Sequence, residues 1–425
     1  MDTIFALSSG RPPAAVSIIR ISGPDAHSAG GQLAGTLPEA RMAAVRELRE
    51  PGTGELLDEA LVLRFESPAS ATGEDVVELH CHGGRAVVDA VLAALGSLEG
   101  LREARPGEFT RRAFENGRID LTEAEGLADL LEAETESQRK AALALAEGGL
   151  SRQIRIWQEV LLASSAIAER AIDYDEEDSL GLDPGLLRDC AALVAELREW
   201  LARPRIEMLK QGVKVVVAGP PNAGKSSLLN AIVGLERAIV TDVPGTTRDV
   251  IEVPISLAGN PVVLTDTAGL RETKDRVEAI GVARSAALVE QADILVWLGA
   301  GAEAPEHPRL VVVHPRADLP DRREAPQGAI AVSSVTGEGL GSLLGRISEI
   351  AASILSLDDA IAMNRRQAAL LDEAAEALEE MGSRTDLVVA AELLRQARAA
   401  FDRLTGRAGV EDVLDALFGR FCLGK

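Results

Sequence analysis

The residues with the clearest chemical potential form the run GPPNAGKS at Gly219–Ser226, which matches the pattern G-x-x-x-x-G-K-[ST] in full. In this pattern the glycines let main-chain N–H groups turn toward phosphates, and the positive end of the following helix adds to the attraction. Lys225 can reach the β and γ phosphates, and Ser226 can hold Mg²⁺. The run therefore predicts a bound nucleoside triphosphate, and a glycine-rich turn that binds nothing is the alternative.

Two further runs follow in the order that such a site requires. Thr246–Thr247 lies in the polar loop TDVPGTTRD, where a threonine can complete the Mg²⁺ coordination when the γ phosphate is present. In Asp266–Gly269, the aspartate can hold the Mg²⁺ shell and the last N–H can sense the γ phosphate. Either run alone would be a weak signal. All three in order along one α/β pattern predict a P-loop GTPase.

The residue that would orient the attacking water is not obvious. Leu270 follows Asp266–Gly269 at the position where Ras-like GTPases place a glutamine, and leucine cannot orient a water. Glu272 and Glu278 lie just downstream, and either carboxylate could do so. From spacing alone, both could equally be solvated surface charges.

The segment that would recognise the base departs from the usual pattern N-K-x-D. Here the predicted strand Leu310–His314 is followed by Pro315-Arg316-Ala317-Asp318, and a later serine position reads Ser333. Asp318 can still grip the edge of guanine, although it could instead be a turn residue. Proline has no side-chain amide, so we expect the bond that ties this loop to the phosphate loop to be lost and nucleotide affinity to fall.

The elements around these residues predict a doubly wound α/β domain over residues 210–357. Short apolar runs that are typical of buried parallel strands alternate with helical stretches, of which Lys225–Val233 is the first. The predicted strands are Val213–Ala218, Ile251–Leu257, Pro261–Thr267, Ile294–Leu298, Leu310–His314 and Ile330–Ser333.

The flanking segments predict two other domains. Residues 1–118 read as α+β, with strands at Val16–Ser22 and Val76–His82 and a helix at Val87–Leu95. Residues 119–209 and 358–425 carry Ala, Leu and Glu at helical spacing, with one break at Gly148-Gly149 in the first part. Later helices are predicted at Gln367–Met381 and Asp386–Leu404. The simplest architecture is therefore an α/β domain inserted into an all-α domain.

Composition restricts the partners and the compartment. The chain has 425 residues and a net charge of −23, so bulk electrostatics would not bind nucleic acid. An RNA substrate would need a local basic patch or a partner protein. We see no apolar run of membrane-spanning length and no signal peptide, and Cys81, Cys190 and Cys422 fit neither a disulfide framework nor a zinc spacing. These features predict a cytoplasmic protein.

One metal-like cluster remains. His80 and His82 flank Cys81 and would share one face of a strand, but no fourth ligand is in sight, which favours a structural or pocket-lining role over a metal.

Nearly the whole chain resembles the MnmE (TrmE) family of tRNA modification GTPases. The N-terminal runs and the C-terminal tail make the resemblance specific, because a GTPase core alone would match many families. The matching runs are RISG (Arg20–Gly23), GEDVVELHCHGG (Gly73–Gly84), ARPGEFTRRAFENGRIDLTEAE (Ala104–Glu125), GPPNAGKSSLLN (Gly219–Asn230), AIVTDVPGTTRD (Ala238–Asp249), DTAGLRE (Asp266–Glu272) and FCLGK (Phe421–Lys425).

The resemblance implies an architecture and a reaction. The parts would be a folate-binding α+β domain, an all-α helical domain and the inserted GTPase domain. The chain would form a homodimer through the N-terminal domains and a heterotetramer with a flavin-dependent partner, MnmG (GidA). Together they would install a carboxymethylaminomethyl or aminomethyl group on C5 of the tRNA wobble uridine. The cofactors implied are GTP or GDP, Mg²⁺, K⁺ and a reduced folate, 5-formyl- or 5,10-methylene-tetrahydrofolate.

The resemblance also assigns residues. Glu278 would orient the water, and Cys422 in the tail would act in the modification, although it could simply pack the tail. Ser226 and Thr247 match the Mg²⁺ ligands, and the K⁺ positions match Asn222, Thr241, Val243 and Thr246. The folate contacts match Arg20, Glu78, Arg118 and Lys425, with arginine at the third position where relatives have lysine. The nucleotide contacts expected in all are Asn222, Ala223, Gly224, Lys225, Ser226, Ser227, Thr241, Asp242, Val243, Pro244, Gly245, Thr246, Thr247, Asp266, Thr267, Ala268, Gly269, Asp318 and Ser333.

Two other functions remain open at this point. A ribosome-assembly GTPase would share the DTAGL run, but it would need an RNA-binding module rich in Lys and Arg. A folate-binding scaffold whose GTPase domain no longer cycles is suggested only by Pro315.

Overall fold

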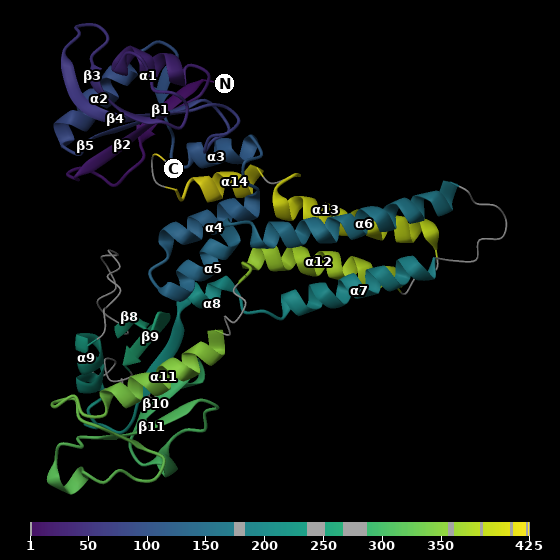
Figure 1. Ribbon diagram of the computed structural model, residues 1–425. Helices are drawn as coiled ribbons and strands as arrows, with labels where there is room; N and C mark the ends of the chain where they lie inside the picture. The colour runs from purple at the N-terminus through teal and green to yellow at the C-terminus, as the bar shows by residue number, and fades with distance from the viewer. Residues whose placement is uncertain are drawn as a thin grey trace, which may run out of the picture. The chain divides into compact units, whose positions relative to one another are not determined.

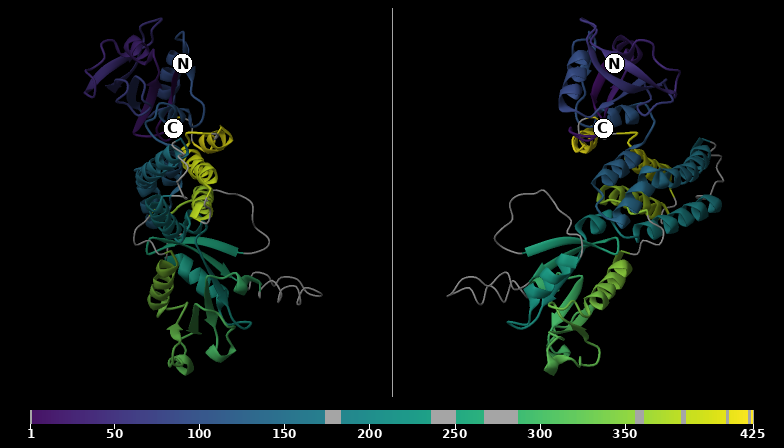
Figure 2. Two further views of the ribbon diagram at one scale, coloured as in Figure 1. Left: turned by 90° about the vertical axis from the view of Figure 1, so that its right-hand side faces the viewer. Right: turned by 60° about the vertical axis from the view of Figure 1, so that its left-hand side comes forward.

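The computed structural model describes residues 2–173, 183–235, 251–266, 287–355, 361–382, 386–408, 411–421 and 424. The chain divides into two compact units (Figures 1 and 2). The first unit comprises Met1–Ala128, Leu150–Cys190 and Glu376–Lys425, and the second comprises Asp129–Gly149 and Ala191–Ala375. Each unit is therefore assembled from segments that are separated in the sequence.

The first unit contains a mixed sheet. Its neighbours are antiparallel except for β1 and β6, in the order β3-β4-β5-β2-β1-β6. Both strands predicted in this segment, β2 and β5, have the predicted bounds. In the described part of the chain the strands are β1 (Thr3–Leu7), β2 (Val16–Ser22), β3 (Ala43–Arg49), β4 (Leu56–Phe65), β5 (Val76–His82) and β6 (Leu101–Glu103).

Helices cover the two faces of this sheet unequally. Helices α1 (Ala26–Ala34) and α2 (Arg85–Gly96) pack on the face that carries Ile19 and Leu79, where they enclose the main apolar core. On the other face, Phe109 of helix α3 (Glu108–Glu115) joins a small cluster with Ile4. On that second face, the side chains of Arg20 on β2 and of Glu78 and His80 on β5 are only partly buried.

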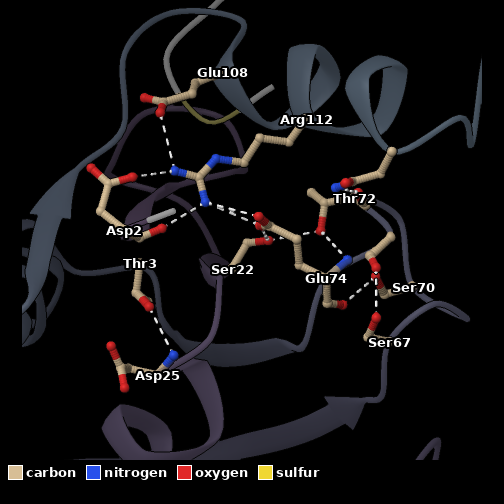
Figure 3. A network of polar contacts seen from close by, with 12 residues as sticks. Asp2, Thr3, Ser22, Asp25, Ser67, Ser70, Thr72, Glu74, Glu108 and Arg112 are labelled. Atoms are coloured by element: carbon tan, nitrogen blue, oxygen red, sulfur yellow. Dashed lines mark hydrogen bonds and ion pairs between the residues drawn. The ribbon is translucent and has the colours of Figure 1, made fainter.

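A buried ion-pair cluster joins α3 to the start of the chain (Figure 3). The guanidinium of Arg112 donates to the carboxylates of Asp2 at 2.8 Å, Glu74 at 3.1 Å and Glu108 at 3.3 Å. The Arg112 side chain is only 6% exposed. A guanidinium buried to this degree requires such partners, because desolvation of an unpaired charge costs several kcal/mol.

The helical part contributes to both units. In the first unit, the ring of Trp157 on α6 stacks on Phe401 of α13 at 5.9 Å, and the two helices run side by side in Figure 1. The predicted helices from Gln367 and Asp386 are confirmed within a few residues, with Asp386 as the N-cap of α13. The helices are α4 (Leu121–Glu132), α5 (Glu136–Ala146), α6 (Gly149–Asp173), α7 (Pro184–Leu201), α8 (Ile206–Gln211), α12 (Arg365–Gly382), α13 (Leu387–Thr405) and α14 (Glu411–Phe418).

The expectation of a single helix break at Gly148-Gly149 is wrong. A second break separates α4 from α5, because Thr135 caps the new helix. The Thr135 hydroxyl accepts the N–H of Gln138 at 3.4 Å, and the Gln138 side chain accepts the N–H of Thr135 at 2.9 Å. This reciprocal capping box has the sequence signature T-x-x-Q, so the break could have been found in the sequence.

The second unit is built on a mostly parallel sheet. Its strand order is β12-β11-β10-β7-β9-β8, with only β8 antiparallel to its neighbour among the described strands. Helices α9 (Lys225–Leu235) and α11 (Leu340–Leu355) pack against the core of one face, while Leu288 and Val289 lie against the other. The strands are β7 (Val213–Ala218), β8 (Ile251–Leu257), β9 (Asn260–Asp266), β10 (Ile294–Leu298), β11 (Leu310–Pro315) and β12 (Ile330–Val332).

These bounds confirm the predicted doubly wound α/β pattern. Short 3₁₀ turns at Gly301–Glu303 and Pro320–Arg322 complete this unit. Across the described residues, no helix is both long and apolar enough to cross a membrane.

Candidate functional site

The loops predicted to bind a nucleotide leave one edge of the second sheet. Val217 of β7 pairs with Asp266 at the end of β9, and Ala218 pairs with Trp297 of β10. On the next strand, Val313 of β11 pairs with Leu298. The carboxyl ends of these strands are therefore aligned, and in open α/β sheets ligands bind just beyond such ends.

The phosphate loop begins at a position that only glycine fits. Gly219 has φ 149°, and a Cβ there would lie 2.6 Å from the carbonyl oxygen of Leu298. The chain then turns through Asn222 at φ 60° and Gly224 at φ 97° before α9 starts at Lys225. The Lys225 ammonium is buried and donates to the carbonyls of Gly219 and Pro220 at 3.0 Å each, so it lies inside its own loop.

The two Mg²⁺ positions that the structure describes lie together. The Ser226 hydroxyl donates to Oδ2 of Asp266 at 2.6 Å, although the two residues come from α9 and β9. Asp266 is 2% exposed. A hydroxyl and a carboxylate are the hard oxygen ligands that Mg²⁺ prefers, so this pair fits the ion that the sequence implies.

The expected base-recognition residue is held in place from the neighbouring strand. Ser333, which follows β12 and is fully buried, donates its hydroxyl to Oδ1 of Asp318 at 2.6 Å. The Ser333 Oγ also accepts the N–H of Thr336 at 3.1 Å. A carboxylate fixed in this way is a positioned acceptor rather than a free turn residue.

The loop expected to recognise the base, Pro315–Asp318 (the base loop), is bonded to the phosphate loop, Gly219–Ser226, contrary to expectation. Pro315 supplies no side-chain amide, as expected, but the guanidinium of Arg316 donates to the main-chain carbonyl of Asn222 at 2.8 Å. Arg316 itself has φ 63° and an exposed side chain. Sequence reasoning missed this bond, because it links residues of two loops that only the folded sheet brings together.

Several predicted site residues lie outside the described residues. They include the second Mg²⁺ position, most of the K⁺ positions, the water-orienting glutamate and two tail residues. They are Thr241, Asp242, Val243, Pro244, Gly245, Thr246, Thr247, Thr267, Ala268, Gly269, Glu278, Cys422 and Lys425.

Two of the four expected folate contacts lie together in the first unit. Arg20 on β2 faces Glu78 on β5, and its Nε and Nη2 donate to Oε1 of Glu78 at 3.0 and 2.8 Å. His80 contacts the other carboxylate oxygen at 3.3 Å, and the Arg20 guanidinium lies 5.6 Å from the centre of the Phe109 ring. This half-buried group of cation, anion and ring is suited to a polar heterocycle. The sequence predicts a structural or pocket-lining role for His80, and its place two residues from Glu78 puts both on one face of β5.

The third folate contact is placed differently. Arg118 lies beyond α3 and lines a separate cavity, with no hydrogen bond or ion pair to Arg20 or Glu78 among the described residues. Near the position of the fourth, the Ser8 hydroxyl donates to the carbonyl of Gly424 at 2.8 Å. Gly424 therefore lies beside the end of β1, the strand that pairs with β2, which carries Arg20. The fourth contact, Lys425, lies outside the described residues.

The three side chains His80, Cys81 and His82 have different surroundings. His82 contacts Asp58 at 2.8 Å, and Cys81 points into the apolar core, where burial raises the pKa of its thiol to about 12. No group of three or more His, Cys, Asp or Glu side chains that could hold a metal ion is found in the described residues.

The phosphate loop, its Ser226–Asp266 pair and the base loop, set on a mostly parallel sheet, define a P-loop GTPase. The family descriptions "GTP-binding protein TrmE N-terminus" and "MnmE helical domain" match residues 3–118 and 121–422. The tRNA modification GTPases MnmE of Erythrobacter litoralis and Novosphingobium aromaticivorans are each 52% identical to the chain, and each alignment covers 100% of both chains. The chain belongs to the MnmE family of tRNA modification GTPases.

Among solved structures, the G domain of the T. maritima FeoB iron transporter is 27% identical. The match covers 33% of this chain and 98% of the FeoB chain, with a TM-score of 0.25. The family assignment rests on the full-length relatives.

Proposed function

We propose that the chain is a K⁺-stimulated GTPase that modifies tRNA together with an MnmG/GidA-like flavoprotein. The pair would install a carboxymethylaminomethyl or aminomethyl group at C5 of the wobble uridine. The observation that carries the GTPase part is the convergence of Lys225, Ser226–Asp266 and Asp318–Ser333 at one sheet edge. The tRNA part is supported by the names of the full-length relatives.

The described residues have distinct roles in this proposal. Asp318 would accept hydrogen bonds from the base edge, while Lys225 would leave its loop carbonyls to contact the β and γ phosphates. Mg²⁺ held by Ser226 and Thr247 would offset phosphate charge. Glu278 would orient the attacking water in line with the γ phosphorus.

The first test compares GTP hydrolysis in K⁺ and Na⁺ buffers at matched ionic strength. A monovalent cation at Asn222, Thr241, Val243 and Thr246 would counter the charge that develops between the β and γ phosphates. We expect K⁺ to accelerate hydrolysis strongly. Equal, slow rates in both buffers would contradict the cation site and favour the folate-binding scaffold.

The second test changes Glu278 to Ala. We expect hydrolysis to fall by about 10²- to 10³-fold, in the range that loss of one positioned group costs, with nucleotide affinity nearly unchanged. Affinity is measured with a fluorescent GDP analogue and hydrolysis by phosphate release. Unchanged hydrolysis would mean that another group orients the water.

The N-terminal domain is proposed to bind a reduced folate at Arg20 and Glu78. The Arg20–Glu78 pair offers both a donor and an acceptor beside the Phe109 ring. Folate binding to the double variant Arg20→Ala, Glu78→Ala, measured by calorimetry, is expected to be lost. Undiminished binding would remove the assignment.

The remaining parts of the proposal follow from the family. They comprise domain limits at 1–118, 119–209, 210–357 and 358–425, a homodimer, a heterotetramer with the flavoprotein, and a role for Cys422 and Lys425 in the chemistry. We expect the reaction in the cytoplasm, where the tRNA substrate is found. The scaffold alternative gains no support, since Arg316 restores the loop contact whose loss suggested it. The ribosome-assembly alternative gains none either, since the full-length relatives are named tRNA modification GTPases.

A further inference from the structure

A cavity of about 490 Å³ opens in the first unit where α3, α4, α6 and α13 approach one another. This volume falls in the range of small-ligand sites, about 300–1,000 Å³. Its charged lining consists of Arg118, Arg155 and Arg407 together with Glu115, Asp120 and Glu123. The three positive and three negative formal charges of the lining cancel. What the cavity can bind therefore depends on which of these groups already have partners within the fold.

All three carboxylates of the lining have partners. Glu115 accepts a hydrogen bond from Arg111 at 3.0 Å. Asp120 and Glu123 form the capping interaction of α4: the N–H of Glu123 donates to Asp120 at 3.0 Å, and the N–H of Asp120 donates to Glu123 at 2.8 Å. Carboxylates at a helix N-terminus are further stabilised by the helix dipole.

The three guanidiniums make no such hydrogen bonds, although the charge of Arg155 acts on the Glu123 carboxylate. Among the described residues, Arg118, Arg155 and Arg407 make no side-chain hydrogen bond or ion pair, and all three are exposed. The nearby helix end does not compete for them strongly, because the main-chain N–H of Arg407 already satisfies the carbonyl of Asp402 at 2.8 Å. The cavity therefore presents three guanidiniums that no hydrogen bond or ion pair among the described residues engages, with only Arg155 near enough to Glu123 for their charges to interact, within a chain of net charge −23.

We propose that this cavity binds phosphate groups of the tRNA backbone. The inference rests on the proposed function, since it supplies guanidiniums that an acidic chain can offer to an RNA substrate. Guanidiniums are suited to phosphate because their planar N–H donors can pair with two phosphate oxygens. The cavity has room for about one nucleotide unit, and Phe114 and Ile119 give it an apolar wall beside the arginines.

The test uses the full chain and an unmodified tRNA transcript. The variant Arg155→Gln, Arg407→Gln removes two guanidiniums that no other assignment uses. The control Arg139→Gln, Arg395→Gln makes the same charge change at two surface arginines that are paired with Glu136 and Glu392. Fluorescence anisotropy gives the Kd for tRNA at several salt concentrations.

We expect the cavity variant to bind tRNA about tenfold more weakly and to lower the slope of log K against log salt by about two. The control variant is expected to stay near the wild-type values. Reduced-folate binding and GTP hydrolysis, measured on the same samples, are expected to be unchanged in both and show that the variants are folded.

Three outcomes would overturn the inference. The cavity and control variants could show the same tRNA affinity and slope, or the wild-type chain could fail to bind tRNA. Folate binding could instead fall while tRNA binding is kept, which would make the cavity a subsite for folate carboxylates. None of these outcomes affects the GTPase proposal, which the K⁺ and Na⁺ comparison tests separately.

Discussion

Two arginines in one short segment, Arg112 within α3 and Arg118 just beyond it, have opposite surroundings. Arg112 is buried among the carboxylates of Asp2, Glu74 and Glu108 (Figure 3). Arg118 is exposed and, within the described residues, has no side-chain partner in its cavity. The charge of Arg112 stabilises the fold through its ion pairs, whereas the charge of Arg118 remains accessible to a ligand.

The difference shows how to distinguish structural from binding charges in an acidic protein. A buried cation must be neutralised within the fold, since the desolvation cost would otherwise exceed the gain. An exposed cation keeps its water and can exchange it for a phosphate. The partners of each charge, rather than the number of charges, therefore identify the site.

The largest expected effect comes from breaking the Arg112 cluster. Arg112→Leu should lower the free energy of unfolding by about 3–5 kcal/mol, because it leaves the buried carboxylate of Glu74 without a cation, whereas Asp2 and Glu108 keep Arg102. Arg155→Leu at the cavity should change it by no more than about 0.5 kcal/mol. Urea unfolding followed by circular dichroism measures both, and equal effects would remove the distinction between the two sites.

A second prediction uses pH, because the two sites contain glutamates with opposite shifts. At Glu108, burial would raise the pKa, but hydrogen bonds from Arg102 and from the N–H of Arg105 outweigh it, and the pKa is lowered. At Glu123, burial raises the pKa and the charge of Asp120 adds to this, and together they outweigh the hydrogen bond from the Asp120 N–H and the charges of Arg155 and Arg152, so the pKa is raised.

The signs follow from linkage between protonation and folding. Glu108 contributes stability above its unfolded pKa of about 4.3, and this stability is lost as the pH falls through its lower folded pKa. Glu123 favours folding below its unfolded pKa, and that contribution is lost as the pH rises through its higher folded pKa.

At pH 7, Glu108→Gln should therefore destabilise the chain. Glu123→Gln should be neutral or stabilising, since glutamine keeps the capping interaction. Urea titrations at pH 3 and pH 7 would show the two effects diverging with pH, and shifts of the same sign would contradict the assignment.

The smallest effect is expected at Arg316, an exposed cation with one main-chain partner. Arg316→Ala removes the bond to Asn222, worth about 1 kcal/mol, so the Kd for GTP should rise about fivefold. Arg316→Lys should lose less, since an ammonium can reach the same carbonyl. If the alanine variant binds GTP as tightly as wild type, the loop contact does not support nucleotide binding.

Most of the second unit could be predicted because its signals are local. Strands such as Val213–Ala218 and Ile294–Leu298 are apolar, β-branched runs bounded by glycine or polar residues, and the structure reproduces their bounds. The phosphate loop was predictable for the same reason, since a consecutive run of residues forms it. The Ser226–Asp266 contact followed from the order of the motifs.

What could not be predicted depends on long-range pairing. The Arg112 cluster joins residues whose positions differ by up to 110, and nothing in their local sequence indicates that they meet. The Arg316–Asn222 bond is of the same kind, with a separation of 94. That Arg118 and Arg407 have no side-chain partner among the described residues is harder still to predict, since it requires knowing where every nearby carboxylate is used.

The interleaved units also set an order of events during synthesis. The ring of Trp157 can stack on Phe401 only after residue 401 has been synthesised. Gln158 likewise bonds to Asp402 across a separation of 244 residues. Nearly all of the second unit lies between these partners, so the ribosome synthesises it while the contacts of α6 with α13 are still missing. Chains stalled after residue 375 should therefore resist protease in the second unit but be cut in α6, which would make this helix the place where a chaperone is needed.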